Sequence, residues 1–327
     1  MNFLISKLRK SWFFVNKIYL FILFLILPIV NATVFIYFLL LYSIIFIYRF
    51  FTRRIPLEPR EKYEYQTYVY KKAKNIELKM DVWYPKTSKK EYPAVFFAHG
   101  GGWVSGFRNQ PNNVSWCKFL ASNGFVAVSI DYRYGLENTM EDILSDYADA
   151  LDYLRKNSRN LRVDRNRIIL MGLSAGGHLA LLYSSYYSYK NNMKRMEGIK
   201  GVVAYYTPSD LKDILSNDSK SLFAKFATLT TLKGSPEKLE YIYEYYSPIT
   251  WISERMPPTL VVHGKNDVVV PFRSSVKLIK RLKEKGVKYL FLVHRTGGHT
   301  FEFELKDFQT VKIIERTVRF MKELVKE

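Results

Sequence analysis

The sequence predicts an α/β fold in which a mainly parallel central sheet is covered by helices on both faces. From residue 94 onward, short apolar runs alternate with longer stretches whose apolar residues recur at helical spacing. Strands that are separated by helices in this way pair in parallel and need cover on both faces. The chain has 327 residues and 48% of them are hydrophobic, which is enough for one large domain with an extension.

The expected elements follow one another along residues 62–327, the predicted catalytic domain. Residues 63–70 and 76–84 alternate in polarity and predict a β-hairpin. The expected parallel strands cover residues 94–98, 125–130, 167–171, 199–205, 259–263 and 289–293. The expected helices cover residues 111–122, 139–156, 178–187, 276–285 and 308–324.

One interval, about residues 207–251, breaks this alternation. It is rich in Ser, Lys and Tyr, and helix-like pieces occur at residues 222–227 and 236–245. Functional sites of open parallel sheets gather at the carboxyl ends of the strands. We therefore expect this interval to form a small cap over the site, where it would influence substrate choice.

The N-terminal region, residues 1–51, is expected to attach the protein to a membrane. No charged residue occurs in the 31 residues from Ile18 to Tyr48, which as one helix would measure about 47 Å and exceed a hydrocarbon core of roughly 30 Å. Pro28 and Asn31 interrupt the stretch, so the alternatives are a helical hairpin over 12–30 and 32–51 or a single tilted span centred on 34–48. A signal peptide cleaved near residues 30–32 would still leave an apolar anchor.

Basic residues flank the apolar stretch on both sides and bear on its topology. They are Lys7, Arg9, Lys10 and Lys17 before it, and Arg49, Arg53 and Arg54 after it. Positive charge at both ends favours the hairpin, with the catalytic domain on the cytoplasmic side. Residues 52–61, which contain Pro56 and Pro59, are expected to form a linker.

Composition excludes several classes of function. The net charge of +20 favours attraction to anionic surfaces such as membrane lipid, but Lys and Arg are spread along the chain without a nucleic-acid-binding module. The single cysteine, Cys117, excludes an internal disulfide framework and a cysteine-rich zinc site. No H-E-x-x-H motif and no carboxylate cluster at ligand spacing occurs, so neither a metal nor a cofactor is expected. The oligomeric state stays open.

The motif with the clearest chemistry is Gly172-Leu173-Ser174-Ala175-Gly176-Gly177, which lies between a predicted strand and a predicted helix. A serine between glycines at such a turn has the form of a nucleophile elbow. The turn is sharp enough to strain the serine backbone, so the neighbouring residues must be small. We expect Ser174 to be a nucleophile whose hydroxyl points out of the turn.

A serine hydroxyl needs a base, and the five histidines of the chain can be weighed one by one. His299 follows two glycines after the last predicted strand, where a loop can bring an imidazole onto the elbow. His294, at the end of that strand, is the alternative, although packing against the sheet suits it better. His178 lies four residues beyond Ser174 on a helix that carries it away from the reaction centre.

The base in turn needs a carboxylate that fixes its tautomer. Asp267 follows the predicted strand 259–263, and Asp210 is its rival. The order Ser174, Asp267, His299 is the order in which a nucleophile elbow is followed by its acid and its base.

The oxyanion formed during acyl transfer needs backbone donors. His99-Gly100-Gly101-Gly102-Trp103 follows a buried strand, and its glycines let backbone amides approach a ligand closely. We expect the amides of Gly101, Gly102 and Ala175 to form the oxyanion hole.

Together these residues resemble the α/β-hydrolase superfamily, and within it the H-G-G-G esterase and lipase group of hormone-sensitive-lipase-like and carboxylesterase-like enzymes. The resemblance covers about residues 64–325 and includes Asp131-Tyr132-Arg133, which is similar to the D-Y-R of that group. In the family the aspartate and arginine of this motif brace the glycine loop. Lys265-Asn266 before Asp267 and Arg295-Thr296 before Gly-Gly-His depart from the family pattern.

The resemblance implies an α/β-hydrolase fold and hydrolysis of carboxylic esters through an acyl-enzyme, with lipid or small acyl esters as substrates. Two alternatives stay open. One is a serine peptidase of the same fold, such as an acylaminopeptidase-like enzyme. The other is a catalytically silent membrane binding protein that retains the fold.

Overall fold

The computed structural model describes residues 21, 22, 24, 32–73 and 76–326. The chain divides into two compact units between Thr52 and Arg53. Residues 52–61 were expected to form a linker, and from Arg53 onward they belong to the second unit. Ile55 is buried in the core of this unit, and its amide donates to Ser115 Oγ at 2.9 Å. The sites described below all belong to this second unit.

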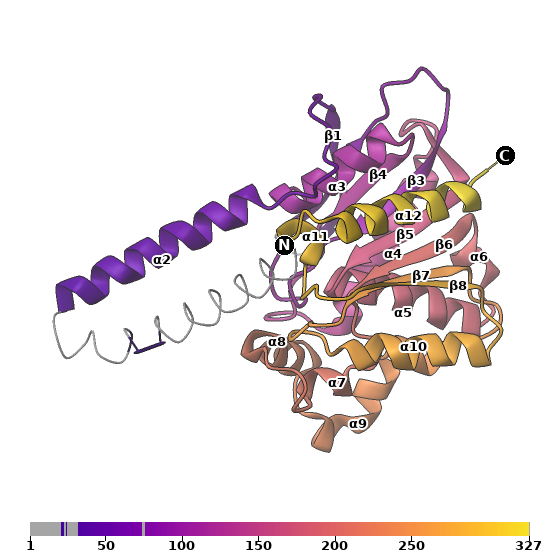
Figure 1. Cartoon of the computed structure of the whole chain (residues 1–327). Helices are drawn as coiled ribbons and strands as arrows, with labels where there is room; N and C mark the ends of the chain where they lie inside the picture. The colour runs from indigo at the N-terminus through magenta and orange to yellow at the C-terminus, as the bar shows by residue number, and fades with distance from the viewer. Residues whose placement is uncertain (1–20, 23, 25–31, 74–75, 327) are drawn as a thin grey trace. The chain divides into compact units, whose positions relative to one another are not determined.

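An eight-stranded sheet forms the centre of the second unit (Figure 1). The strands are β1 (Tyr65–Ala73), β2 (Ile76–Trp83), β3 (Tyr92–Ala98), β4 (Val126–Ile130), β5 (Val163–Leu173), β6 (Ile199–Tyr205), β7 (Thr259–Gly264) and β8 (Tyr289–His294), in the order β1-β2-β4-β3-β5-β6-β7-β8. β2 pairs antiparallel with β1 and with β4, and every pair from β4 to β8 is parallel. The predicted hairpin and the mainly parallel sheet are confirmed.

Helices cover both faces of the sheet, as the alternating sequence predicts (Figure 1). One face is packed by α4 (Met140–Lys156), α5 (Ala175–Tyr189) and α10 (Phe272–Glu284), and the other by α3 (Pro111–Ser122) and α12 (Phe308–Leu324). Successive residues of a strand point to opposite faces, so Phe96 of β3 joins the first cluster and Phe97 the second. Cys117 of α3 lies in the second cluster, where burial raises the pKa of its thiol.

The interval between β6 and β7 forms a group of short helices, as expected for a cap. They are α7 (Lys212–Leu215), α8 (Leu222–Leu232), α9 (Pro236–Tyr245) and the 3₁₀ helix η1 (Pro248–Trp251). α8 starts at the predicted residue but is five residues longer than the predicted piece. Its N-terminus is capped by Ser221, whose Oγ accepts a hydrogen bond from Ala224 N at 3.1 Å. Two further short helices, α6 (Met193–Met196) and α11 (Phe301–Glu304), complete the unit.

The first unit contains α2 (Ala32–Thr52). The expected membrane crossing is not supported, because none of the helices in the described part of the chain has both the length and the apolar content needed to span a bilayer. The expectation came from the charge-free stretch as a whole, and most of its first half lies outside the described residues. The choice between hairpin and single span, and the cytoplasmic location of the catalytic domain, stay predictions.

Arg108 ties the segment after the glycine loop to the sheet. Its Nε donates to Asp81 Oδ1 of β2 at 2.9 Å, and its Nη1 donates to Asp131 Oδ2 at 2.7 Å. Asp131 Oδ1 also accepts a hydrogen bond from the Arg108 amide at 3.0 Å. Asp81 is fully buried, so Arg108 offsets a charge that would otherwise be costly to bury.

The arginine of the D-Y-R motif has a different role from the one that the resemblance implies. Asp131 braces the segment after the glycine loop, but its partner is Arg108, whereas Arg133 Nε donates to Asp146 of α4 at 2.7 Å. Arg133 is drawn to α4 because Asp142 and Asp146 lie one turn apart on the helix face that it contacts. The middle residue, Tyr132, donates its hydroxyl to His99 O at 2.8 Å and so supports the start of the glycine loop.

We expect Arg108→Ala to lower the free energy of unfolding by about 3 kcal/mol, because it leaves the buried carboxylate of Asp81 without its cation. Urea unfolding of the full chain measures the change. Arg281→Ala is the matched control, since Arg281 forms only an exposed pair with Glu284 at 3.4 Å, and a change within about 0.5 kcal/mol is expected. Equal losses in the two variants would contradict a bracing role for Arg108.

Candidate active site

Ser174 lies in the turn between β5 and α5 with φ 51° and ψ −115°, a strained conformation for a residue with a side chain. The glycines around it are required by close contacts. A Cβ on Gly172 would lie 2.2 Å from the carbonyl carbon of Gly176, and a Cβ on Gly176 would lie 2.1 Å from Ala98 O. The residue pattern of the motif therefore reflects a real elbow, as predicted.

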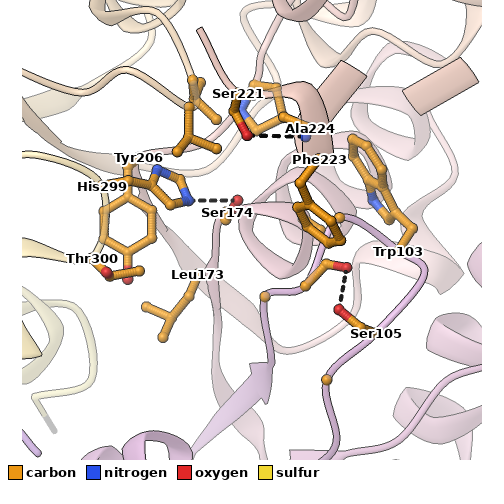
Figure 2. Close-up of a pocket in the computed structure, with 18 of the residues that line it drawn as sticks. Trp103, Ser105, Leu173, Ser174, Tyr206, Ser221, Phe223, Ala224, His299 and Thr300 are labelled. Atoms are coloured by element: carbon orange, nitrogen blue, oxygen red, sulfur yellow. Dashed lines mark hydrogen bonds between the residues drawn. The ribbon is translucent and has the colours of Figure 1, made fainter. Parts of the chain in front are cut away.

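His299 lies in the loop between β8 and α11 and reaches the elbow (Figure 2). Its Nε2 is 3.1 Å from Ser174 Oγ, and its Nδ1 is 2.7 Å from Asp267 Oδ2. An ionised carboxylate only accepts hydrogen bonds, so Nδ1 carries the proton and the lone pair of Nε2 faces the serine hydroxyl. The structure thus brings together the three side chains that the sequence singled out.

Asp267 follows β7 and is held by three further groups besides His299. Its Oδ1 accepts hydrogen bonds from the amides of Val269 and Val270 at 2.8 and 2.9 Å, and its Oδ2 accepts one from His263 Nε2 at 3.1 Å. Burial alone would raise the pKa of this carboxyl, but the charge at His299 and the hydrogen bonds from His263 and His299 outweigh it and hold the pKa well below the usual value. Asp267 therefore stays ionised wherever the protein is folded near neutral pH.

The glycine loop places backbone amides beside Ser174. Gly101 O accepts hydrogen bonds from the amide and the hydroxyl of Ser105, at 3.0 and 2.9 Å. Because the C=O and N–H of one peptide plane point in opposite directions, the amide of Gly102 is turned away from Ser105. Ala175 opens α5, and a first-turn amide has no partner inside its own helix. These backbone groups line the same cavity as Ser174.

This cavity has a volume of about 260 Å³ and contains every predicted site residue except Asp267, which lies behind His299. Its wall is apolar where the cap and the segment after β7 meet, at Ile214, Phe223, Ala224, Val269 and Val270. Polar side chains line another part, namely Arg53, Gln110, Asn112 and Thr300. A Cβ on Gly102 would lie 2.9 Å from the Cβ of Ala227, so the cap helix α8 packs directly on the glycine loop.

The alternative bases and acids lie elsewhere. His294 Nε2 pairs with Asp307 at 3.2 Å, and Asp210 binds Lys277 Nζ at 2.7 Å. His178 is buried, and its Nε2 donates to Tyr246 O at 2.7 Å; burial lowers its pKa to about 4. His99 is also buried, with its pKa lowered to about 4 for the same reason.

Sequence reasoning missed two residues of the site. His263 supports Asp267, and the only sequence signal for it is its spacing of four residues from that aspartate. Tyr206 follows β6, lines the cavity, and places its ring 4.5 Å from the His299 ring (Figure 2). Nothing in the sequence marks Tyr206 except its place at the carboxyl end of a strand. Within the described residues, no cluster of His, Cys, Asp and Glu could hold a metal ion.

Two esterases of other organisms are similar to this chain in sequence. Esterase LipC of Mycobacterium tuberculosis is 29% identical over 230 residues, which cover 68% of this chain and 57% of LipC. A probable isoprenylcysteine alpha-carbonyl methylesterase of Oryza sativa, ICME, is 25% identical over 241 residues, which cover 69% of this chain and 56% of that protein. The chain therefore spans little more than half the length of these two relatives.

A solved structure agrees with this similarity. The thermophilic esterase Est2 of Thermogutta terrifontis superposes with a TM-score of 0.63 at 25% identity, over 80% of this chain and 92% of Est2. The sequence model of the BD-FAE family matches residues 80–282, which is more than half of the chain and includes the glycine loop, the elbow and Asp267. The protein therefore belongs to the BD-FAE family, within the carboxylesterase and lipase group of the α/β-hydrolases.

Proposed function

We propose that the protein hydrolyses carboxylic esters, with Ser174 as nucleophile, His299 as general base and Asp267 as the acid that orients it. The observation that carries the proposal is the continuous relay from Asp267 Oδ2 through His299 to Ser174 Oγ, at 2.7 and 3.1 Å. The esterases among the relatives support the same reaction class.

In the first half of the reaction, Ser174 Oγ attacks the ester carbonyl while its proton passes to His299 Nε2. The ionised carboxylate of Asp267 stabilises the imidazolium that forms. The carbonyl oxygen becomes an oxyanion, which the amides of Gly101, Gly102 and Ala175 bind. Loss of one such donor typically slows turnover by about 100- to 1,000-fold.

In the second half, His299 returns the proton to the leaving alkoxide, and the acyl group stays on Ser174 as an ester. Water then attacks this ester and gives a proton to His299, which passes it to Ser174 Oγ as the bond to the acyl group breaks and the carboxylic acid leaves. The same oxyanion donors serve both steps, because each passes through a tetrahedral intermediate.

The size of the cavity favours esters with a short acyl group as substrates. Its volume of about 260 Å³ is below the range of roughly 300–1,000 Å³ that is typical of pockets for drug-sized ligands. Phe223 and Ala227 of α8 close over Gly102, which limits the space beside the oxyanion donors. Acetyl or other small acyl esters, carried by a lipid or another alcohol, fit this restriction.

We also propose that the protein is attached to a membrane through its N-terminal region. The support is the exposed apolar surface of α2, on which Tyr37, Leu40, Ile44 and Tyr48 are all more than half exposed. A helix that is apolar on all sides needs an apolar environment around it. The membrane would then hold the protein and also supply lipid esters as substrates.

Replacement of the proposed nucleophile should abolish activity. We expect Ser174→Ala to lose turnover of p-nitrophenyl acetate by at least about 1,000-fold and to lose labelling by a fluorophosphonate probe. His299→Ala should show a comparable loss of turnover, whereas His294→Ala, the alternative base, should retain activity. Labelling of Ser174→Ala at the wild-type level would contradict the proposal that Ser174 is the nucleophile of an enzyme.

Removal of a cap side chain should change acyl selectivity. Phe223→Ala enlarges the cavity, so we expect the ratio of kcat/KM for p-nitrophenyl octanoate to that for the acetate to rise about tenfold, which corresponds to about 1.4 kcal/mol. Leu222→Ala is the control, because Leu222 is 82% exposed and does not line the cavity. An unchanged ratio in Phe223→Ala would show that α8 does not limit acyl length.

Polar substitutions in α2 should release the protein from membranes. We expect the full-length chain to stay with the membrane fraction after alkaline carbonate treatment, and the double variant Leu40→Asp, Ile44→Asp to be depleted from it, because two charges oppose burial in lipid. Met193→Asp with Phe308→Asp is the control, since both residues are exposed and lie in the second unit. Wild-type protein found wholly in the supernatant would contradict the attachment.

A further inference from the structure

Glu302 is a fully buried carboxyl group that takes no part in the steps above. It lies on α11, three residues after His299, and its exposed fraction is 0%. Its Oε1 accepts a hydrogen bond from the hydroxyl of Tyr206 at 2.6 Å, and its Oε2 has no hydrogen-bond partner among the described residues. Buried carboxylates are usually paired with a cation or with several donors, so this environment needs an explanation.

Tyr206 connects Glu302 to the reaction centre. Its ring lies 4.5 Å from the imidazole of His299 at an angle of 58° (Figure 2), and its hydroxyl ends at Glu302. Its backbone is held as well: the amide donates to Val262 O at 2.6 Å, and φ is 39°. Tyr206 is therefore held at its backbone and at its hydroxyl, with its ring packed at a tilt against the imidazole of His299.

We propose that Glu302 is a positioning residue for the base: through Tyr206 it holds the imidazole of His299 between Asp267 and Ser174, and in its ionised form it stabilises the imidazolium that forms during attack. The inference rests on the proposed ester hydrolysis. It adds to that reaction a second carboxylate, which acts on the base through Tyr206 and not by direct contact.

The charge state of Glu302 changes near neutral pH. Burial raises the pKa of Glu302 from the ordinary 4.5 to about 7, against the opposing effects of the Tyr206 hydrogen bond and of positive charge at His299. The indole of Trp116 on α3 also lowers this pKa, although its Nε1 does not reach hydrogen-bond geometry. Burial raises the pKa values of Tyr205 and Tyr206 well above 10, so both tyrosines stay neutral. Asp267, which interacts with Tyr206 and contacts His299, has its pKa held well below the usual value and stays ionised.

Glu302 affects catalysis because the attraction between its carboxylate and a positive charge at His299 acts equally on both groups. Positive charge at His299 lowers the pKa of Glu302, so an ionised Glu302 must stabilise an imidazolium at His299 by the same interaction. During the reaction, His299 becomes an imidazolium when it takes the proton of Ser174 or of water. Ionised Glu302 therefore stabilises the transition state more than the ground state, which raises kcat and not the affinity for substrate.

Ionisation of Glu302 also costs folding stability. Because the pKa is raised on folding, the native state binds more protons than the unfolded state between about pH 4.5 and 7. Stability from this group is therefore present below pH 4.5 and is lost as the pH rises through 7. Glu302→Gln removes the titration, so its melting temperature should exceed that of wild type by a larger margin at pH 8 than at pH 5.

The decisive measurement is the pH dependence of kcat in Glu302→Gln. With a short-chain p-nitrophenyl ester and the full chain, we expect kcat of wild type to exceed that of the variant about tenfold at pH 8. The excess should shrink toward unity at pH 6, where Glu302 is protonated in wild type, while KM changes less than about twofold. Glu315→Gln, on the exposed face of α12, is the matched control and should follow wild type at both pH values.

Tyr206→Phe provides a second test in case Glu302→Gln does not fold. Tyr206→Phe keeps the ring against His299 but removes the hydroxyl that binds Glu302, so it should reduce kcat at pH 8, and combination with Glu302→Gln should add no further loss. A ratio of wild type to Glu302→Gln that is equal at pH 6 and pH 8, or a change confined to KM, overturns the inference. Absence of esterase activity and of probe labelling in wild type would instead overturn the proposed function itself.

Discussion

The strained turn at Ser174 is the constraint on which the site depends. A positive φ at this residue is tolerated only because β5 enters the turn from the middle of a sheet and α5 leaves it packed on that sheet. The contacts that forbid a Cβ at Gly172 and Gly176 also press the start of α5 against the end of β3. The glycine loop begins where β3 ends, so the same close approach that strains the nucleophile brings the oxyanion donors beside it.

Two carboxyl groups near His299 experience opposite environments. Asp267 receives two backbone amides and two imidazole N–H groups, so its ionised form is favoured even though it is buried. Glu302 is equally buried but receives one tyrosine hydroxyl, and burial therefore raises its pKa to about 7. A pair of carboxyl groups whose environments separate their pKa values is a common way to assign different roles to the same chemical group.

The cap connects substrate choice to the oxyanion loop. α8 packs on Gly102 through Ala227 and presents Phe223 to the cavity, while Arg53, Gln110, Asn112 and Thr300 line it from outside the cap. Changes in α8 can thus alter the space for the acyl group without touching the relay of Ser174, His299 and Asp267. This division is typical of folds in which a fixed scaffold holds the chemistry and an insertion sets selectivity.

The amino-acid sequence by itself predicted the parallel sheet, the elbow and the glycine loop, and it favoured His299 and Asp267 over His294 and Asp210. These features are local: each depends on a short strand, a turn and a few glycines, or on the order of residues along the chain. It did not reveal Arg108 as the partner of Asp81 and Asp131, nor His263 behind Asp267, nor Tyr206 and Glu302 behind His299. Those pairings join residues that are far apart in sequence or carry no local pattern, so only the tertiary structure, which decides what each buried polar group meets, could show them.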